Sequence, residues 1–260
     1  MMQALRIAAT GMNAQQLNVD ILSNNIANLN TTGFKQGMPA FADLVYQNKI
    51  AVGAITSNSG TIAPTGLQIG LGVNVGSVYR IMQQGTIGPT GNPFDFAMSG
   101  RGFFKITMPD GTTNYTRDGS FQINADGQVV TKDGFSLDPG ITVPTNATDF
   151  TVTPSGVASC KVAGVTTNLG SINVAMFTNE AGLENLGDNL YGETEASGTP
   201  TDTNPGEDGA GTISQNALEG SNVDSIASIT NLITAQRAYE LNSKVITAAD
   251  QMLSTLTQMT

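Results

Sequence analysis

The residues that enzymes use for proton transfer and metal binding are scarce in this sequence. The chain has no histidine, the usual general base and the commonest metal ligand. Its one cysteine, Cys160, excludes an internal disulfide. Serine and threonine are plentiful, yet neither Gly-x-x-x-x-Gly-Lys-[Ser/Thr] nor Gly-x-Ser-x-Gly occurs. We therefore expect no enzyme, no catalytic residue, no cofactor and no metal.

The aspartates that could bind a cation lie in Asp-Gly pairs, at Asp110, Asp118, Asp126 and Asp133. Such a pair is a strong hairpin signal, and no run has the acidic spacing of a calcium loop. Turn chemistry therefore explains these aspartates better than calcium binding does. A glycosidase built on two carboxylates stays open by motif alone, but an aromatic content of 6% without tryptophan argues against a sugar-binding cleft.

The net charge of −10 is concentrated in one part of the chain. Between Lys161 and Arg237 no basic residue occurs, and ten of the 21 acidic residues lie there. Nucleic-acid binding requires clustered lysine and arginine, so we expect no nucleic-acid partner. We interpret the acidic stretch as a solvated loop and rim.

No apolar run approaches the ~20 residues of a membrane helix, so we expect no membrane insertion. The start of the chain lacks the basic region and apolar core of a cleaved signal peptide. By these signals alone the chain reads as cytosolic.

Each end of the chain predicts a long helix with apolar residues three and four apart. The N-terminal pattern is made by Leu5, Ala8, Met12, Val19, Leu22, Ile26 and Leu29. The C-terminal helix has a first seam at Leu232, Ala235, Tyr239, Ile246, Ala249, Leu253 and Leu256, with Asn242 as its polar member, and Ser221 or Asn222 as the expected cap. A second seam follows Leu241, Val245, Ala248, Met252 and Met259. Two seams exceed what one partner helix covers, so we expect association in a ring or helical array.

The N-terminal helix runs out into a polar stretch, residues 23–35. Four asparagines there lower helix propensity, so we expect them to gain partners outside the helix. Gly33 can adopt a left-handed conformation and end the element, and Phe34 can add an apolar contact.

Between the ends, the pattern predicts strands. Residues 47–65 read as an extended excursion, but Ile50, Val52, Ile55 and Ile62 make it more apolar than a disordered linker. Residues 67–75 alternate apolar and small or polar side chains, which predicts one strand. Residues 94–177 predict short antiparallel strands with aromatic residues toward a core.

These elements predict an α+β fold. Long N- and C-terminal helices form a coiled-coil-like core, and an antiparallel β-rich domain is inserted between them. We expect residues 1–33 and 222–260 to form an assembly core, residues 34–95 and 178–221 a connecting region that includes the insert at 47–65, and residues 96–177 an outer β-domain.

The stretch at residues 23–35 resembles the N-terminal signature of the bacterial flagellar rod and hook proteins. Further resemblance to this basal-body rod family lies at residues 43–47, 66–73, 99–104, 115–121 and 236–240. Residues 46–66 and the chain length favour its distal-rod members, with proximal-rod or hook-type members as the alternative. A different class, a monomeric secreted β-rich binding module, is the other alternative.

The resemblance implies a structural subunit that polymerises with itself into a straight hollow shaft. Such a shaft transmits motor torque to the hook and lets exported subunits pass. The implied partners are the proximal rod protein, the hook protein, the P and L ring proteins and the flagellar type III export apparatus. The implied location is the basal-body rod across the periplasm, reached by export without a cleaved signal peptide. Assembly roles carry over to Asn24, Asn25, Asn28, Gly33 and Phe34, and to Gln236, Arg237, Tyr239 and Glu240.

Overall fold

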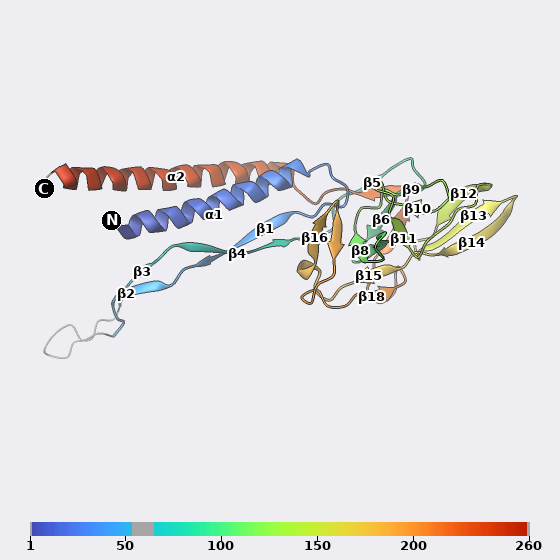
Figure 1. The fold of residues 1–260 in the computed structure, drawn as a ribbon, viewed down its shortest axis with the longest axis horizontal. Coiled ribbons are helices and arrows are strands. Elements are labelled where there is room, and N and C mark those ends of the chain that lie inside the picture. Colours follow the sequence, from blue (N-terminus) through green and yellow to red (C-terminus); the bar gives the residue numbers. More distant parts are fainter. Residues whose placement is uncertain (1, 54–64, 259–260) are drawn as a thin grey trace. The chain divides into compact units, whose positions relative to one another are not determined.

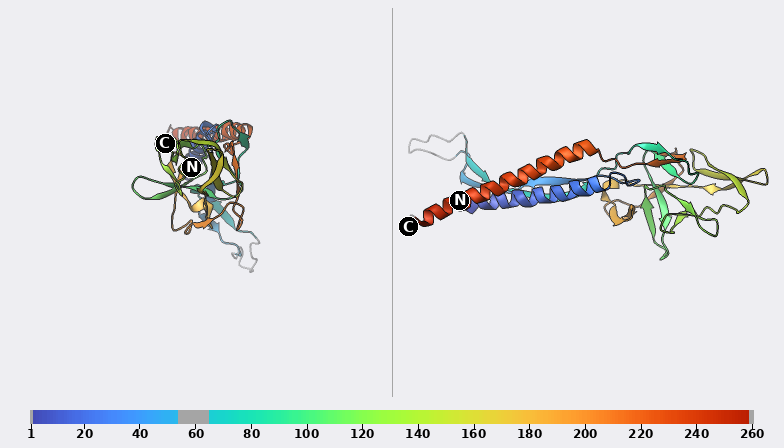
Figure 2. Two further views of the ribbon diagram at one scale, coloured as in Figure 1. Left: turned by 90° about the vertical axis from the view of Figure 1, so that its right-hand side faces the viewer. Right: turned by 90° about the horizontal axis from the view of Figure 1, so that it is seen from above.

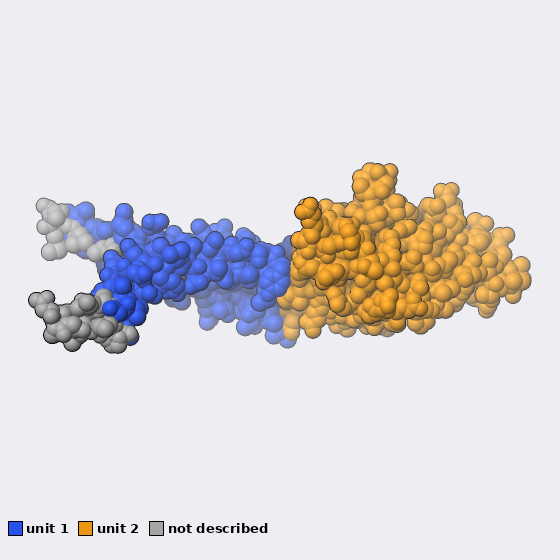
Figure 3. Space-filling model, turned by 90° about the horizontal axis from the view of Figure 1, so that it is seen from below, with its two compact units in different colours: residues 1–26, 37–79, 225–260 blue, residues 27–36, 80–224 orange. Residues whose placement is uncertain are grey.

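The structure is a computed structural model that describes residues 2–53 and 65–258. The predicted fold class is confirmed as α+β, because a helix lies at each end of the chain and antiparallel strands lie between them (Figure 1). The chain divides into two compact units (Figure 3). Unit 1 consists of residues 1–26, 37–79 and 225–260, and unit 2 of residues 27–36 and 80–224.

Unit 1 contains the terminal helices α1 (Met2–Ala27) and α2 (Ser225–Gln258), which run antiparallel beside each other (Figures 1 and 2). They approach closely where Gly11 faces Asn242. A Cβ atom at Gly11 would lie 2.9 Å from Nδ2 of Asn242. Glycine costs about 1 kcal/mol of helix stability relative to alanine. Here that cost has a structural reason, because the missing side chain makes room for the polar member of the first seam.

Unit 1 also contains two narrow antiparallel ribbons. Strand β1 (Gly37–Asp43) pairs with β4 (Val73–Arg80), and β2 (Tyr46–Ile50) pairs with β3 (Leu67–Gly70). The prediction of one strand over residues 67–75 was wrong, because the chain breaks between β3 and β4 at Gly72. Gly72 has φ +125, and the Thr10 hydroxyl occupies the place where its Cβ would stand. Thr10 then accepts a hydrogen bond from the Val73 amide at 3.4 Å.

Unit 2 is built from short strands. They are β5 (Ile87–Pro89), β6 (Phe96–Ser99), β7 (Phe103–Thr107), β8 (Thr113–Thr116), β9 (Gln122–Ile123), β10 (Val129–Val130), β11 (Ser136–Asp138), β12 (Ala147–Val152), β13 (Val157–Val162) and β14 (Val165–Ser171). They continue with β15 (Val174–Met176), the 3-10 turn η1 (Glu180–Gly182), β16 (Glu184–Gly187), β17 (Leu190–Gly192), β18 (Thr201–Thr203), β19 (Thr212–Gln215) and β20 (Ala217–Glu219).

The main sheet of unit 2 has the strand order β16-β17-β8-β7-β11-β10-β9, and β15 joins β7 to β18. Strands β12, β13 and β14 form a separate sheet, while β19 pairs with β6 and β20 with β5. From the sequence, residues 178–221 were expected to belong to the connecting region. In the structure their strands β16, β17 and β18 lie in the same sheet as β7. Local patterning does not reveal such a pairing, since it joins segments far apart in the chain.

Three of the predicted Asp-Gly turns are confirmed as hairpin turns. Asp110 lies between β7 and β8, Asp126 between β9 and β10, and Asp133 between β10 and β11. Asp118 differs, because β8 and β9 are not neighbours in the sheet. Gly119 is needed there because the carbonyl oxygen of Phe96 fills the space of a Cβ.

The predicted aromatic core of unit 2 is confirmed and has two parts. Adjacent residues of a strand point to opposite faces, so Phe103 and Phe104 of β7 enter different clusters. Phe104 packs edge to face on Phe121, with ring centres 5.6 Å apart. Phe103 packs against Phe177 at 5.8 Å. None of the described helices is long and apolar enough to span a membrane.

Candidate functional site

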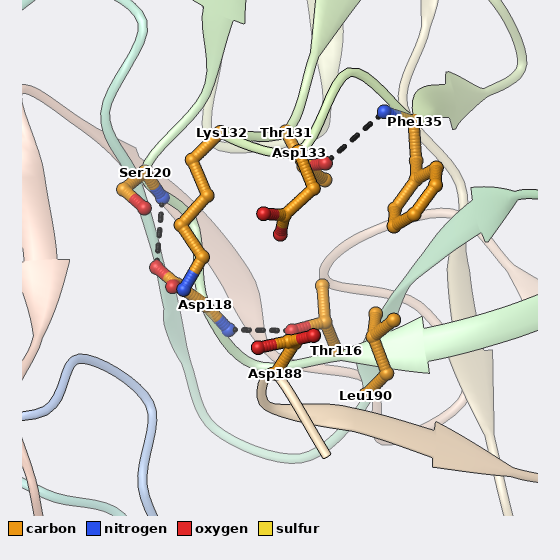
Figure 4. Close-up of a pocket in the computed structure, with 9 residues that line it drawn as sticks. All are labelled: Thr116, Asp118, Ser120, Thr131, Lys132, Asp133, Phe135, Asp188 and Leu190. Atoms are coloured by element: carbon orange, nitrogen blue, oxygen red, sulfur yellow. Dashed lines mark hydrogen bonds between the residues drawn. The ribbon is translucent and has the colours of Figure 1, made fainter. Parts of the chain in front are cut away.

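A small hollow in unit 2 gathers the carboxylates that could do chemistry (Figure 4). Asp118, Asp133 and Asp188 line it together with Lys132. Its volume is about 20 Å³, which suffices for one water molecule and not for a substrate. Asp118 accepts a hydrogen bond from the Ser120 amide at 3.0 Å, a local turn interaction. Among the described residues no cluster of potential metal ligands occurs.

The end of α1 places one asparagine of the polar stretch in the interior of unit 1. Asn25 is 4% exposed, and its amide forms two hydrogen bonds with the backbone of Gly37. Its nitrogen donates to the Gly37 carbonyl at 2.8 Å, and its oxygen accepts from the Gly37 amide at 2.9 Å. The expectation that these asparagines gain partners outside the helix is confirmed for Asn25. The pair fixes the first residue of β1 against the last turns of α1.

Gly33 has the predicted left-handed conformation, with φ +67, but the prediction that it ends the helix was wrong, because α1 already ends at Ala27. A Cβ at this position would lie 2.7 Å from backbone atoms of Arg117 and Asp118, so only glycine fits. Phe34 follows and is buried, with the guanidinium carbon of Arg80 5.0 Å from its ring centre.

The next residue, Lys35, belongs to a buried ion cluster that it forms with Arg117 and Glu219 in unit 2. Lys35 Nζ lies 2.6 Å from Oε1 of Glu219, and Arg117 Nη1 lies 3.4 Å from Oε2. All three side chains are almost completely shielded from solvent. Burial lowers the pKa of Lys35 below its ordinary value, an effect that exceeds the opposing attraction of Glu219. Burial likewise lowers the pKa of Arg117.

Hydrogen bonds to backbone groups join three chain segments around this ion cluster. The Gly33 amide donates to the carbonyl of Glu219 at 2.8 Å, and the Gly85 amide donates to Oε1 of Glu219 at 2.9 Å. Asn222 accepts from the Gln36 amide at 2.7 Å and donates to the Gln83 carbonyl at 3.0 Å. Residues 33–36, 83–85 and 219–222 are thus held together inside unit 2.

Sequence reasoning missed the ion cluster and misjudged its surroundings. Glu219 is 1% exposed, so the interpretation of the whole acidic stretch as solvated was wrong at this residue. The predicted helix cap was also wrong, since α2 begins at Ser225 and the Asn222 side chain binds backbone groups of unit 2. The available signal was that Lys35 and Arg117 fall within stretches that carry the family resemblance.

The predicted helix seams differ in how far the single chain covers them. In α2 most of the first seam is covered, with Ala235 and Ala249 almost fully buried, but Tyr239 is 40% exposed. Three members of the second seam are exposed, at 61% for Leu241, 47% for Val245 and 50% for Met252, and its last member, Met259, lies outside the described residues. Partial or full burial is found for every N-terminal seam position, namely Leu5, Ala8, Met12, Val19, Leu22, Ile26 and Leu29. The first-seam residues Leu232, Ile246 and Leu253 are partly buried.

The structure brings several predicted assembly residues together and leaves others apart. Val19 of α1 and Gln236, Tyr239 and Glu240 of α2 line one shallow hollow in unit 1. Asn24 and Arg237 are exposed, Asn28 is partly buried, and Gly33 and Phe34 lie inside unit 2. Of the insert residues, Ile50 and Val52 are exposed, while Ile55 and Ile62 lie outside the described residues.

Family models match the chain in three places. A model described as flagella basal body rod protein matches residues 5–35, and one described as flagellar hook protein FlgE/F/G D1 domain matches residues 97–160. A third, described as flagellar basal body rod FlgEFG protein C-terminal, matches residues 214–259.

Relatives that match over nearly their full length include several flagellar basal-body rod proteins named FlgG. The flagellar basal-body rod protein FlgG of Caulobacter vibrioides is 54% identical over 99% of this chain and 99% of its own. The FlgG proteins of Agrobacterium fabrum and Borreliella burgdorferi are 49% and 42% identical, each over 97% of both chains. The flagellar hook protein FlgE of Helicobacter mustelae is 40% identical over 52% of this chain and 30% of its own.

Proposed function

Because this chain belongs to the flagellar basal-body rod protein family, we propose that its copies join through the apolar surface that unit 1 leaves exposed. The chain is a structural subunit of the distal rod of the flagellum. A hook-type role is not favoured, since the hook relative matches only about half of the chain. The remaining question is which surface makes the polymer.

The observation that carries the proposal is the exposed second seam of α2. Leu241, Val245 and Met252 lie on one side of the helix, adjacent to the side that packs inside unit 1. Fully burying each such side chain contributes roughly 1.5–3 kcal/mol. A monomer gains only part of this free energy, because these side chains stay 47–61% exposed, whereas a helical array of subunits can gain the rest at every contact.

Helix packing between and within subunits would then be coiled-coil-like, as the heptad spacing of the seams indicates. Packed around a common axis, such helices would line a hollow shaft that carries torque to the hook and passes exported subunits. We further propose the proximal rod protein, the P and L ring proteins and the type III export apparatus as partners, and export across to the periplasm without a cleaved signal peptide. The family resemblance supports these proposals.

The test is to place a charge in the exposed seam. Leu241→Asp should leave the monomer as stable as the parent, because the side chain is exposed there. It should block polymerisation, because a carboxylate between apolar helices costs several kcal/mol. Gln251→Glu adds the same charge to an exposed position of the same helix and serves as the matched control. Sedimentation and electron microscopy measure assembly, and parent-like filaments of Leu241→Asp would exclude the seam as an interface.

The insert at residues 47–65 is a second candidate contact. Val52 is 65% exposed and Ile50 is 47% exposed, so unit 1 does not bury them itself. We propose that the insert docks on a neighbouring subunit and prevents the sliding that a curved filament requires. Deletion of residues 49–63 should then yield curved or polymorphic filaments by electron microscopy. Filaments as straight as the parent would exclude this role.

A further inference from the structure

The charges of the buried ion cluster do not balance. Lys35 and Arg117 both approach the same carboxylate, that of Glu219. Two buried cations on one carboxylate leave one positive charge in excess. The arrangement also leaves Nε of Arg117 buried without a hydrogen-bond partner. A buried charge without full compensation is costly, so the ion cluster is under electrostatic stress when all three groups are ionised.

The surroundings do not remove this excess. Arg80 adds a further cation, since its Nη1 donates to the Lys35 carbonyl at 2.8 Å. The field of Glu180 raises the pKa of Lys35, but its carboxylate is bonded to Arg101 Nε at 2.7 Å. Tyr191 also faces Arg117, and burial raises the pKa of its phenol, which keeps it neutral.

The hydrogen bonds around the ion cluster indicate that Lys35 can become neutral without leaving a buried acceptor unpaired. Each acceptor of Lys35 has a second donor. Lys35 Nζ donates to the Gln83 carbonyl at 2.9 Å, and this carbonyl also accepts from Asn222 Nδ2 at 3.0 Å. Oε1 of Glu219, the other acceptor, also accepts from the Gly85 amide at 2.9 Å. Glu219 cannot be neutralised in the same way, because Lys35 and Arg117 would then be two buried cations without a carboxylate partner.

We propose that protonation of Lys35 destabilises unit 2. The unit is more stable against unfolding when the Lys35 amine is neutral than when it is protonated. A neutral amine still donates to the Gln83 carbonyl and to Glu219, and the pair Arg117–Glu219 is then balanced. This inference concerns folding of the subunit and does not depend on how copies assemble.

The sign of the pH dependence follows from the lowered pKa of Lys35 in the folded chain. Between that lowered pKa and the ordinary value of 10.5, the unfolded chain binds the proton and the folded chain does not. The free energy of unfolding therefore rises with pH in this window and is independent of Lys35 below it. An ordinary exposed lysine salt bridge gives the opposite trend.

The experiment measures denaturant unfolding of the full chain at several pH values between neutral pH and 10.5. Near-ultraviolet circular dichroism of the tyrosines monitors the unfolding. Other groups titrate in the same range, so the parent is compared with Lys35→Met. The parent's unfolding constant should fall relative to that of Lys35→Met by up to about tenfold per pH unit within the window. Lys161→Met removes an exposed lysine paired with Asp149 and should show no such difference.

At neutral pH, Lys35→Met should be at least as stable as the parent, whereas Glu219→Gln should raise the unfolding constant on the order of 10²- to 10³-fold. A direct measurement covers the case in which Lys35→Met does not fold. The ¹³Cε signal of Lys35 in the folded parent should titrate below its ordinary pKa. A midpoint at or above the ordinary value, or a parent that loses stability with pH relative to Lys35→Met, would overturn the proposal.

Discussion

Units 1 and 2 differ in how completely they bury their large side chains. In unit 2, large side chains such as Phe104 and Ile106 are completely shielded, and even charged groups find partners inside the unit. In the described part of unit 1, the fully buried apolar residues are all alanines, namely Ala8, Ala14, Ala235 and Ala249. Its large apolar residues are either partly buried, as Leu22 is, or exposed, as Leu241 is. Unit 2 therefore contains its own core, whereas unit 1 leaves apolar surface uncovered, which we propose further subunits cover.

The largest expected loss of stability comes from truncating a phenylalanine in unit 2, and the same truncation in unit 1 is the comparison. Phe104→Ala in β7 should destabilise the chain by about 3–5 kcal/mol, because it leaves a cavity in a close-packed core. Phe41→Ala in β1 should change the stability of the monomer by less than about 0.5 kcal/mol, since that ring is 43% exposed. Denaturant unfolding measures both. Equal losses would mean that unit 1 has a core of its own.

A smaller loss is expected at the glycine of the polar stretch in unit 2. Gly33→Ala should destabilise by about 1–3 kcal/mol, because alanine is strained at φ +67 and its Cβ would overlap the backbone of Arg117. Gly91→Ala is the control, as nothing lies within 4 Å of its added Cβ. If both alanine variants unfold at the same denaturant concentration, the close approach at Gly33 carries no energetic weight.

The next smaller effect is expected at Asn25, which is buried in unit 1 and hydrogen-bonded to Gly37. Asn25→Ala should destabilise by roughly 1–3 kcal/mol, since the Gly37 amide and carbonyl lose their partner. Asn13→Ala, at an exposed position of the same helix, supplies the same gain in helix propensity without that loss. Hydrogen exchange of the Gly37 amide should accelerate only in the Asn25 variant. Unchanged exchange there would place the stabilising contact elsewhere.

The smallest effect on the monomer is expected at the exposed seam. Leu241→Ala should change monomer stability by less than about 0.5 kcal/mol, whereas Leu137→Ala in β11 should cost about 2–5 kcal/mol. The two leucines are 61% and 1% exposed, respectively. Leu241→Ala should nevertheless weaken polymerisation, measured by the critical concentration for filament formation. An unchanged critical concentration would show that the second seam is not covered in the polymer.

The sequence alone determined the parts of this protein that depend on local patterning. Heptad spacing predicted α1 and α2, Asp-Gly pairs predicted the turns at Asp110, Asp126 and Asp133, and the glycine at position 33 predicted the left-handed backbone there. Each of these depends on residues close together in the chain, where propensity, period and turn geometry act directly. The stretches that resemble the rod family also indicated the family membership from the sequence, because they are long and specific.

Only the tertiary structure decided the partners of the charged residues and the course of the strands. Lys35 and Glu219 are 184 positions apart, and no periodic pattern connects them. The break at Gly72 required Thr10 from α1, and the pairing of β17 with β8 joined segments that the sequence assigned to different regions. Burial of a charge depends on what surrounds it in space, so a local rule that acidic residues are solvated fails where a distant cation is brought beside one.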